Sequence, residues 1–377
     1  MKLLFAIKAL DDAKGGAERV LCQLCSHLAG SGHEVVLVSF DVPGGKPFYP
    51  LDPRVRRVPL ALGSVTDKAR AIETLRRIPA LRRIVAGEQP DVAVGFMHSM
   101  FVLLGFALTG TGIPVIGSEH IVPQHYRNRR LEYLLLLASR FFLDRVTVLS
   151  KEVAGLYPPG LRRRMVAIPN PVAAASSFAD PAGVGRPRKT ILNVGRLDPQ
   201  KDQQTLILAF ARLAPEFSDW DLKIVGEGPL RLSLQDLIER LRLADRVFLP
   251  GATPEIEREY MDAQIFAMPS HYESFGLATA EAMAHGLPAV GFADCPGTRE
   301  RIRHGTNGFL AVGQDRVNGL AGALRQLMDS ADLRAKLGAN ARVSVADFSP
   351  SSVFALWENL LWNVARATED ASKREVS

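Results

Sequence analysis

Short apolar runs alternate with longer amphipathic stretches along almost the whole chain, and this order constrains the fold more than any other feature. In the first half the apolar runs cover residues 3–7, 34–40, 92–96, 115–118, 146–149 and 166–168. Stretches with helical periodicity separate them at residues 17–29, 68–86 and 130–143. Parallel strands need long crossover connections, usually helices, so the alternation predicts a doubly wound parallel α/β sheet.

The alternation stops once and then restarts. Residues 171–188 are rich in Ala, Ser, Gly and Pro without any period, which is typical of an interdomain linker. Apolar runs follow at residues 191–194, 222–225, 247–249, 265–268 and 289–292, with helical stretches at 203–213, 230–241, 277–284, 317–328 and 333–347. We therefore predict two Rossmann-like domains, residues 1–170 and 189–350, facing each other across a cleft at the carboxyl ends of their strands. Ligands of this architecture usually bind in such a crevice.

The two predicted domains differ in charge. Residues 1–170 hold 23 Lys and Arg against 14 Asp and Glu, a net of +9, whereas the rest of the chain has a net of −3. A basic half indicates an anionic partner, which can be nucleic acid, a phosphate-bearing substrate or a membrane surface. Nucleic acid is disfavoured, because no helix-turn-helix, zinc-finger or aromatic stacking pattern accompanies the charge.

Cysteine use and hydropathy indicate the compartment. Cys22, Cys25 and Cys295 are too few for a disulfide framework, which favours a reducing environment. Nothing completes a zinc site beside Cys22 and Cys25, so we expect no metal. Residues 92–118 lack charged side chains but break into strand, helix, turn and strand, so we predict no membrane span. These features predict a cytoplasmic protein.

The densest group of chemistry-bearing residues follows the apolar run at 265–268. A loop containing Ser274, Phe275 and Gly276 leads there into a helical stretch that begins at Leu277. Backbone N–H groups of Gly276 and Leu277 would point freely from the helix N-terminus, which suits a diphosphate. The loop therefore predicts a phosphate-binding site.

Two glutamates flank this helix start. Glu273 lies in the loop, where it can accept hydrogen bonds from sugar hydroxyls, and Glu281 lies about one turn into the helix. A carboxylate at Glu281 can accept two hydroxyl hydrogen bonds, as from a ribose. The alternative interpretation is an ordinary capped helix with two solvated glutamates.

A second group follows the apolar run at 191–194. Gly195 makes a turn, and Arg196 and Lys201 come five residues apart. Arg offers a forked pair of hydrogen bonds and Lys a point charge, so the two can clamp a leaving diphosphate without a metal ion. Two surface cations on a loop are the plainer interpretation.

Weaker signals lie at other predicted strand ends. Gly15 and Gly16 open the helical stretch after the first run and can approach a phosphate. Gly226 and Leu249 end two runs of the second domain, where a nucleotide base could pack.

Two histidines follow neighbouring runs of the first domain. His98 and His120 each come just beyond an apolar run, at the rim of the predicted cleft. We assign both to the acceptor side, with His120 the better candidate for touching the sugar.

Together these motifs resemble the retaining GT-B glycosyltransferases of family 4. The family's Glu-x7-Glu pattern matches Glu273 and Glu281, and its Gly-Arg and Lys pattern matches Gly195, Arg196 and Lys201. Residues 15–18 and 297–308 are also similar, so the resemblance covers nearly the whole chain.

This resemblance implies roles for the residues. Arg196 and Lys201 would bind the donor diphosphate, Glu281 the ribose and Glu273 the transferred sugar. His120 would lie near the sugar's hydroxymethyl group, and Gly16 would approach the phosphates. His120, Arg196, Lys201 and Glu273 would form the catalytic group. Enzymes of this family keep the anomeric configuration of the transferred sugar. The family's final helix, residues 352–366 here, crosses back to the first domain.

The resemblance also implies substrates. Residues 15–20, 48–53 and 118–120 are similar to bacterial enzymes that extend lipid-linked saccharides from UDP-sugars, including N-acetylgalactosaminyltransferases. We expect a UDP-sugar rather than a GDP-sugar as donor and no other cofactor. The transferred group would be a hexose or N-acetylhexosamine, and the acceptor a polysaccharide or a polyprenyl-diphosphate-linked saccharide of the cell envelope. Those enzymes often carry the segment Asp-Cys-Pro-x-Gly-Pro-Arg-Glu. The corresponding residues 294–300 of this chain are one residue shorter and lack the second Pro.

A basic helical stretch suggests a membrane partner. Residues 68–85 place Ile72, Leu75, Ile78, Leu81 and Val85 on one face, flanked by four arginines, and three more arginines open the stretch at 130–143. This arrangement is typical of a surface that docks on the anionic inner face of the plasma membrane. A helix that covers the sheet with solvated arginines is the alternative.

Three other functions fit parts of the pattern. A UDP-sugar 2-epimerase would bind the same donor but need no acceptor, and a non-catalytic sugar-nucleotide sensor would not require the paired cations and glutamates. A metal-dependent transferase of the other common fold would use an Asp-x-Asp motif after a strand. Asp219 and Asp221 have that spacing but come before the run at 222–225.

Overall fold

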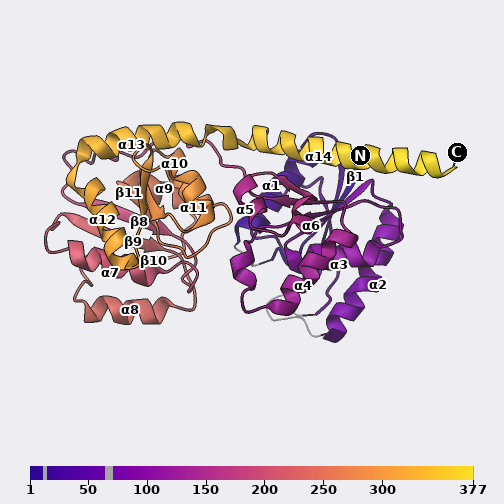
Figure 1. Ribbon diagram of the computed structural model, residues 1–377, viewed down its shortest axis with the longest axis horizontal. Helices are drawn as coiled ribbons and strands as arrows, with labels where there is room; N and C mark the ends of the chain where they lie inside the picture. The colour runs from indigo at the N-terminus through magenta and orange to yellow at the C-terminus, as the bar shows by residue number, and fades with distance from the viewer. Residues whose placement is uncertain (12–14, 64–70, 377) are drawn as a thin grey trace. The chain divides into compact units, whose positions relative to one another are not determined.

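The computed structural model describes residues 1–11, 15–63 and 71–376 of the chain. This part of the chain separates into two compact units (Figure 1). Unit 1 consists of Met1–Pro171 together with Ser351–Ser377, and unit 2 consists of Val172–Pro350. Each unit is built on one parallel sheet. The cleft between the two sheets stays a prediction.

The sheet of unit 1 is doubly wound. Its strands are β1 (Lys2–Ala6), β2 (Glu34–Ser39), β3 (Arg56–Pro59), β4 (Val92–Phe96), β5 (Val115–Ser118), β6 (Arg145–Val148) and β7 (Met165–Ala167). They run parallel in the order β3-β2-β1-β4-β5-β6-β7. The order reverses between β1 and β4, and such a switch point is where ligands of open α/β sheets bind.

Helices cover the sheet of unit 1. They are α1 (Gly16–Gly30), α2 (Ala71–Glu88), α3 (His98–Leu108), η1 (Pro123–Tyr126), α4 (Arg130–Ala138), η2 (Ser139–Phe141), α5 (Lys151–Gly155), α6 (Pro159–Arg162) and most of α14 (Pro350–Val376). Figure 1 shows α2 and α3 side by side, and the two helices pack together. The last helix, α14, belongs to this core: Trp357 is 3% exposed and its ring stacks on Phe96 at 5.9 Å.

The sheet of unit 2 repeats the same winding. Its strands are β8 (Lys189–Val194), β9 (Trp220–Val225), β10 (Val247–Gly251), β11 (Ile265–Met268), β12 (Ala289–Phe292) and β13 (Gly308–Ala311). The parallel order is β10-β9-β8-β11-β12-β13, so the switch point lies between β8 and β11.

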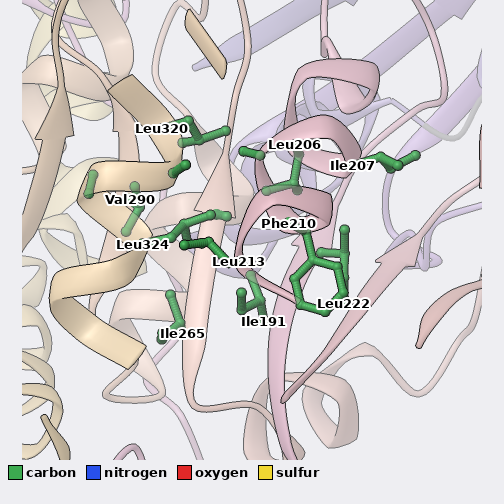
Figure 2. Close-up of a cluster of buried hydrophobic side chains, with 14 of the residues drawn as sticks. Ile191, Leu206, Ile207, Phe210, Leu213, Leu222, Ile265, Val290, Leu320 and Leu324 are labelled. Atoms are coloured by element: carbon green, nitrogen blue, oxygen red, sulfur yellow. The ribbon is translucent and has the colours of Figure 1, made fainter. Parts of the chain in front are cut away.

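The helices of unit 2 enclose an apolar core. They are α7 (Gln203–Leu213), α8 (Arg231–Arg240), α9 (Ile256–Asp262), α10 (Leu277–Ala284), α11 (Pro296–Arg301), α12 (Arg316–Asp329), α13 (Ala331–Ser344) and η3 (Ala346–Phe348). Figure 2 shows Leu206 and Phe210 of α7 and Leu324 of α12 gathered over Ile191 and Leu222 of the strands. These side chains are fully buried, and their removal from water is the main force that holds the layers together.

The structure confirms the predicted fold class of two doubly wound parallel α/β sheets. It adds two strands that the apolar runs did not reveal, β3 and β13. Both lie at a sheet edge. An edge strand has one neighbour and need not be apolar on both faces, which explains why the polar sequence Arg56–Pro59 gave no signal.

The apolar segment at 92–118 forms β4, α3 and β5, as predicted. Among the described residues, no helix combines the length and the apolar composition that crossing a membrane requires.

Helix α2 differs from the predicted amphipathic arrangement. Leu75, expected on the apolar face, is 66% exposed, whereas Arg77, expected in solvent, is 4% exposed. The Arg77 guanidinium lies 4.1 Å from the centre of the Phe40 ring and donates hydrogen bonds to the Leu62 carbonyl. A cation–π contact and a carbonyl acceptor offset the cost of burying this charge. Residues 68–70 of the predicted stretch, and the side chain at position 72, lie outside what the structure describes.

Candidate functional site

Two loops meet at the switch point of unit 2. One follows β8 and carries Lys201, and the other follows the neighbouring strand β11 and carries Glu273. Lys201 Nζ donates to Glu273 Oε1 at 2.6 Å, and Ser270 Oγ donates to the same oxygen at 2.6 Å. Glu273 is only 8% exposed, so its carboxylate depends on these donors. Two residues predicted on separate motifs thus form one polar pair.

Arg196 lies on the same loop as Lys201. Its side chain is 70% exposed, and its Nε donates to Asp198 Oδ2 at 2.5 Å. Asp198 Oδ1 also accepts the backbone N–H of Lys201 at 3.2 Å. Asp198 therefore fixes the turn through the Lys201 backbone and binds the Arg196 side chain, which stays exposed and accessible to an anionic ligand.

Helix α10 begins directly beyond this pair. Its cap residue Gly276 has φ +77°, a left-handed conformation that favours glycine, and supplies no side-chain acceptor to the first turn. The first turn of a helix has N–H groups without helical partners, so the start at Leu277 offers donors to an anion. Phe275 anchors the loop, since its ring is 1% exposed and lies 4.7 Å from the Arg301 guanidinium. Ser274, which precedes Phe275 in the chain, is half-buried.

Glu281 lies on α10, one turn from its start. The hydroxyl of Tyr260 donates to Glu281 Oε2 at 3.1 Å, and Tyr260 on α9 is itself buried. The carboxylate is half-buried and oriented by a rigid aromatic side chain. Each oxygen of a carboxylate can accept more than one hydrogen bond.

The ends of β8, β9 and β10 pack closely. Gly226 has φ +150°, and a Cβ there would lie 2.0 Å from the Gly195 carbonyl oxygen. Gly195 N donates in turn to the Val225 carbonyl at 3.0 Å. Leu249 is half-buried, and its carbonyl accepts from Arg231 at 2.9 Å. Glycine is required at position 226 because any side chain would separate the two loops.

In unit 1, His120 follows β5 in an apolar environment. Its Nε2 lies 2.9 Å from Ser118 Oγ, and its ring stacks on Phe96 at 5.1 Å. Burial lowers the pKa of His120 to about 4, so the imidazole is neutral at pH 7. A neutral ring can exchange hydrogen bonds with hydroxyl groups without adding charge.

His98 is the first residue of α3, after β4. Its Nε2 lies 3.4 Å from Glu132 Oε2, and its ring packs edge-on against Tyr126 at 5.0 Å. Burial outweighs the nearby carboxylate and lowers the pKa of His98 to about 4. The strands that the two histidines follow, β4 and β5, are neighbours in the sheet. Both imidazoles are uncharged at neutral pH.

Glu119 stands between these histidines in the chain and was not predicted. It is 1% exposed and accepts hydrogen bonds from the Tyr126 hydroxyl at 2.9 Å and from the Ile121 N–H at 3.0 Å. Burial raises the pKa of Glu119 to about 7 despite these donors.

The glycine pair near the amino terminus opens helix α1. Gly15 caps the helix and Gly16 is its first residue. A Cβ on Gly15 would lie 2.1 Å from Glu18 Oε2, so the carboxylate of Glu18 folds back over the helix start.

Three unpredicted residues support the unit 2 site: Asp198, Tyr260 and Ser270. Asp198 lies inside a motif that the sequence singled out, but its role as a bridge is visible only in the fold. Tyr260 comes from another helix and has no sequence signal.

The two aspartates of the alternative Asp-x-Asp metal motif form ion pairs with basic side chains. Asp219 pairs with Lys189, and Asp221 pairs with Arg188 and Arg246. Within residues 1–11, 15–63 and 71–376, no group of three or more His, Cys, Asp or Glu is arranged to hold a metal ion.

Two family models match the chain. The model described as glycosyl transferases group 1 matches residues 179–344, and the model described as glycosyltransferase family 4 matches residues 14–175. The site of unit 2 lies within the first match.

Curated relatives and a solved structure agree with these matches. The chain is 30% identical to the D-inositol 3-phosphate glycosyltransferase of Thermobispora bispora over 69% of its own length and 68% of the relative. It is 24% identical to the amylovoran biosynthesis glycosyltransferase AmsD of Erwinia amylovora over 96% and 99%. Its structure resembles that of Anabaena HepE in complex with UDP-glucose, with a TM-score of 0.78 and 19% identity over 96% and 100% of the two chains. This likeness identifies the fold as GT-B.

Proposed function

The chain belongs to the glycosyltransferases of group 1 and family 4, and from this premise we propose that it transfers a hexose or N-acetylhexosamine from a UDP-sugar with retention of configuration. The acceptor is a polysaccharide or a lipid-linked saccharide of the cell envelope. One observation carries the proposal: the 2.6 Å contact between Lys201 and Glu273 at the switch point of unit 2, beside the start of α10.

Lys201 and Arg196 bind the donor diphosphate. When a nucleoside diphosphate leaves, negative charge grows on its phosphate oxygens, and cations placed in advance lower the barrier. Lys201 already lies against a carboxylate, so its ammonium is held in place before the donor arrives. The exposed Arg196 adds a forked donor, and the N–H groups at Gly276 and Leu277 complete the anion site.

Glu273 and Glu281 hold the two sugars of the donor. Glu273 accepts hydrogen bonds from hydroxyls of the transferred sugar, and Glu281, oriented by Tyr260, accepts from the ribose. Seven residues separate them in the chain, with Glu273 before the start of α10 and Glu281 within the helix.

His120 and His98 serve the acceptor side. Both imidazoles are neutral at pH 7, which suits hydrogen bonds to sugar hydroxyls. Retention follows if the acceptor hydroxyl attacks on the face that the leaving phosphate occupies, and that phosphate then takes the proton.

Two comparisons support the substrates. The fold neighbour HepE was solved with UDP-glucose, which favours a UDP-sugar, and AmsD acts in amylovoran biosynthesis, which favours a polysaccharide acceptor.

Donor screening tests this function. We expect UDP to bind more tightly than GDP in titration calorimetry, and slow hydrolysis of one UDP-sugar to release a sugar whose first-formed anomer, observed by NMR, matches the donor. Binding of neither nucleotide would overturn the proposal. A C2 epimer formed without acceptor would establish a 2-epimerase instead, and tight UDP binding with no turnover of any sugar would indicate a sensor.

A further inference from the structure

Helix α4 of unit 1 presents leucines to solvent. Leu131, Leu134 and Leu135 are 70%, 61% and 48% exposed. Positions i, i+3 and i+4 share one face of a helix, so the three side chains form a continuous apolar stripe. A helix that only covers a sheet would turn such a stripe toward the core.

The stripe continues beyond the end of α4. Phe141 of η2 is 75% exposed, and Phe106, near the end of the neighbouring helix α3, is 59% exposed. The Phe106 ring meets Phe142 edge-on at 6.5 Å, and α3 packs against α4 and η2. We call Leu131, Leu134, Leu135 and Phe141 the α4 patch. A contiguous exposed apolar patch indicates an interaction surface.

Arginines border the α4 patch at both ends. Arg127, Arg129 and Arg130 are exposed at the start of α4, and the Arg140 guanidinium lies 4.6 Å from the centre of the Phe141 ring. The start of a helix carries partial positive charge, so guanidinium groups there are electrostatically unfavourable. An ion pair of Arg129 with Glu132 at 3.4 Å offsets part of this cost. This electrostatic cost has a counterpart if the arginines bind an anionic surface.

We propose that the α4 patch docks on the surface of an anionic lipid bilayer. The leucines and Phe141 enter the interface between headgroups and acyl chains, and the bordering arginines bind lipid phosphates. A second copy of the chain fits less well, because a symmetric pairing would bring two sets of arginines together.

The same reasoning separates α4 from α2. Helix α2 exposes Arg76 and Arg83, while among its described side chains Leu75 is the large exposed apolar one and Arg77 is buried against Phe40. Over residues 73–88, whose side chains the structure describes, α2 therefore has exposed charge without a neighbouring apolar stripe.

Vesicle co-sedimentation of the full chain tests the proposal. We expect binding to vesicles of phosphatidylglycerol and phosphatidylcholine, little binding to phosphatidylcholine alone, and weaker binding at 0.5 M salt (about a 4 Å screening length). Changing Leu131, Leu134 and Leu135 together to Ser should weaken binding at least about tenfold. The double variant Arg127→Gln/Arg130→Gln should also lose about tenfold or more, since each cation near such a surface contributes roughly fivefold.

Matched variants serve as controls. Arg76→Gln/Arg83→Gln on α2 removes the same charge and should change binding by less than about twofold. Leu232→Ser on α8, an exposed leucine of unit 2, should have no effect. Circular dichroism spectra and thermal unfolding curves, unchanged in every variant, show that the altered unit remains folded.

Several results would overturn the proposal. These are equal binding to neutral vesicles, equal losses from the α2 and α4 arginine pairs, no binding to either vesicle, or a dimer in sedimentation velocity that the leucine variant dissolves. Vesicle binding by a chain that ignores UDP would leave this inference standing and overturn the proposed donor instead.

Discussion

The two units share one strand order but place opposite chemistry at the carboxyl ends of their strands. Unit 2 holds ion pairs there, Lys201 with Glu273 and Arg196 with Asp198. Unit 1 holds His98 and His120, whose pKa values burial lowers to about 4. The same winding therefore supports a charged site in one unit and a neutral site in the other, because function depends on the loops and not on the fold.

The surroundings of each group explain the difference. His120 stacks on the apolar Phe96 ring, and Glu119 accepts hydrogen bonds from neutral donors only, the Tyr126 hydroxyl and the Ile121 N–H, which do not offset the cost of burying its charge. Around Glu273, Lys201 and Ser270 supply direct donors. This contrast supports the proposal that unit 2 receives an anionic diphosphate and unit 1 receives uncharged hydroxyls.

The largest expected effect is a change in the pH dependence of stability when Glu119, a buried carboxyl of unit 1, is replaced. Its folded pKa of about 7 lies above the usual value, so its contribution to stability is present at low pH and is lost as the pH rises through 7. Glu119→Gln stays neutral and keeps an acceptor for Tyr126. Relative to the native chain, the variant should gain about 2–3 kcal/mol of unfolding free energy between pH 5 and pH 8. Urea unfolding across this range measures the gain.

Glu34→Gln is the matched control for this variant, since Glu34 lies exposed on the same sheet. Parallel pH curves for the native chain and Glu119→Gln would show that unit 1 does not suppress charge at this position.

The next effect tests the charged site of unit 2. Lys201→Ala should lower transfer at least about tenfold, which corresponds to ~1.4 kcal/mol of transition-state stabilisation, because the diphosphate loses a cation. Steady-state assays with the donor identified by screening measure it. The control is Lys223→Ala, which removes a lysine of β9 that pairs with Glu259 of α9, and this variant should retain activity. Equal rates in both variants would remove Lys201 from the site.

Glu281→Ala should also lower transfer at least about tenfold through the loss of ribose hydrogen bonds. Tyr260→Phe keeps the carboxylate and removes only the hydroxyl that orients it, so we expect a smaller loss of about threefold. KM and kcat measured for both variants sharpen the assignment. A larger effect from Tyr260→Phe than from Glu281→Ala would contradict it.

The smallest expected effect is that of chelation. Transfer should be unchanged by EDTA, because Arg196, Lys201 and the start of α10 supply the positive charge, while Asp219 and Asp221 are engaged by cations. Initial rates with and without chelator measure this. A loss of transfer activity that added Mg²⁺ reverses would show that the basic side chains of unit 2 cannot support the reaction alone.

The sequence by itself determined the two doubly wound sheets and the places where chemistry gathers. Apolar periodicity and glycine positions are local properties, and runs such as Val92–Phe96 are apolar because both faces of a central strand are covered. The loop with Glu273 and Gly276 could be found in this way, and it lies in the part of the chain that the model for glycosyl transferases group 1 matches.

Only the tertiary structure decided which of these residues meet. Lys201 and Glu273, 72 positions apart, touch because β8 and β11 are neighbours in the sheet, and Tyr260 reaches Glu281 from another helix. It also decided that Arg77 is buried while Leu131 is exposed, against what their residue types suggest. Burial, pairing and pKa depend on neighbours from distant parts of the chain, and local sequence periodicity carries no information about them.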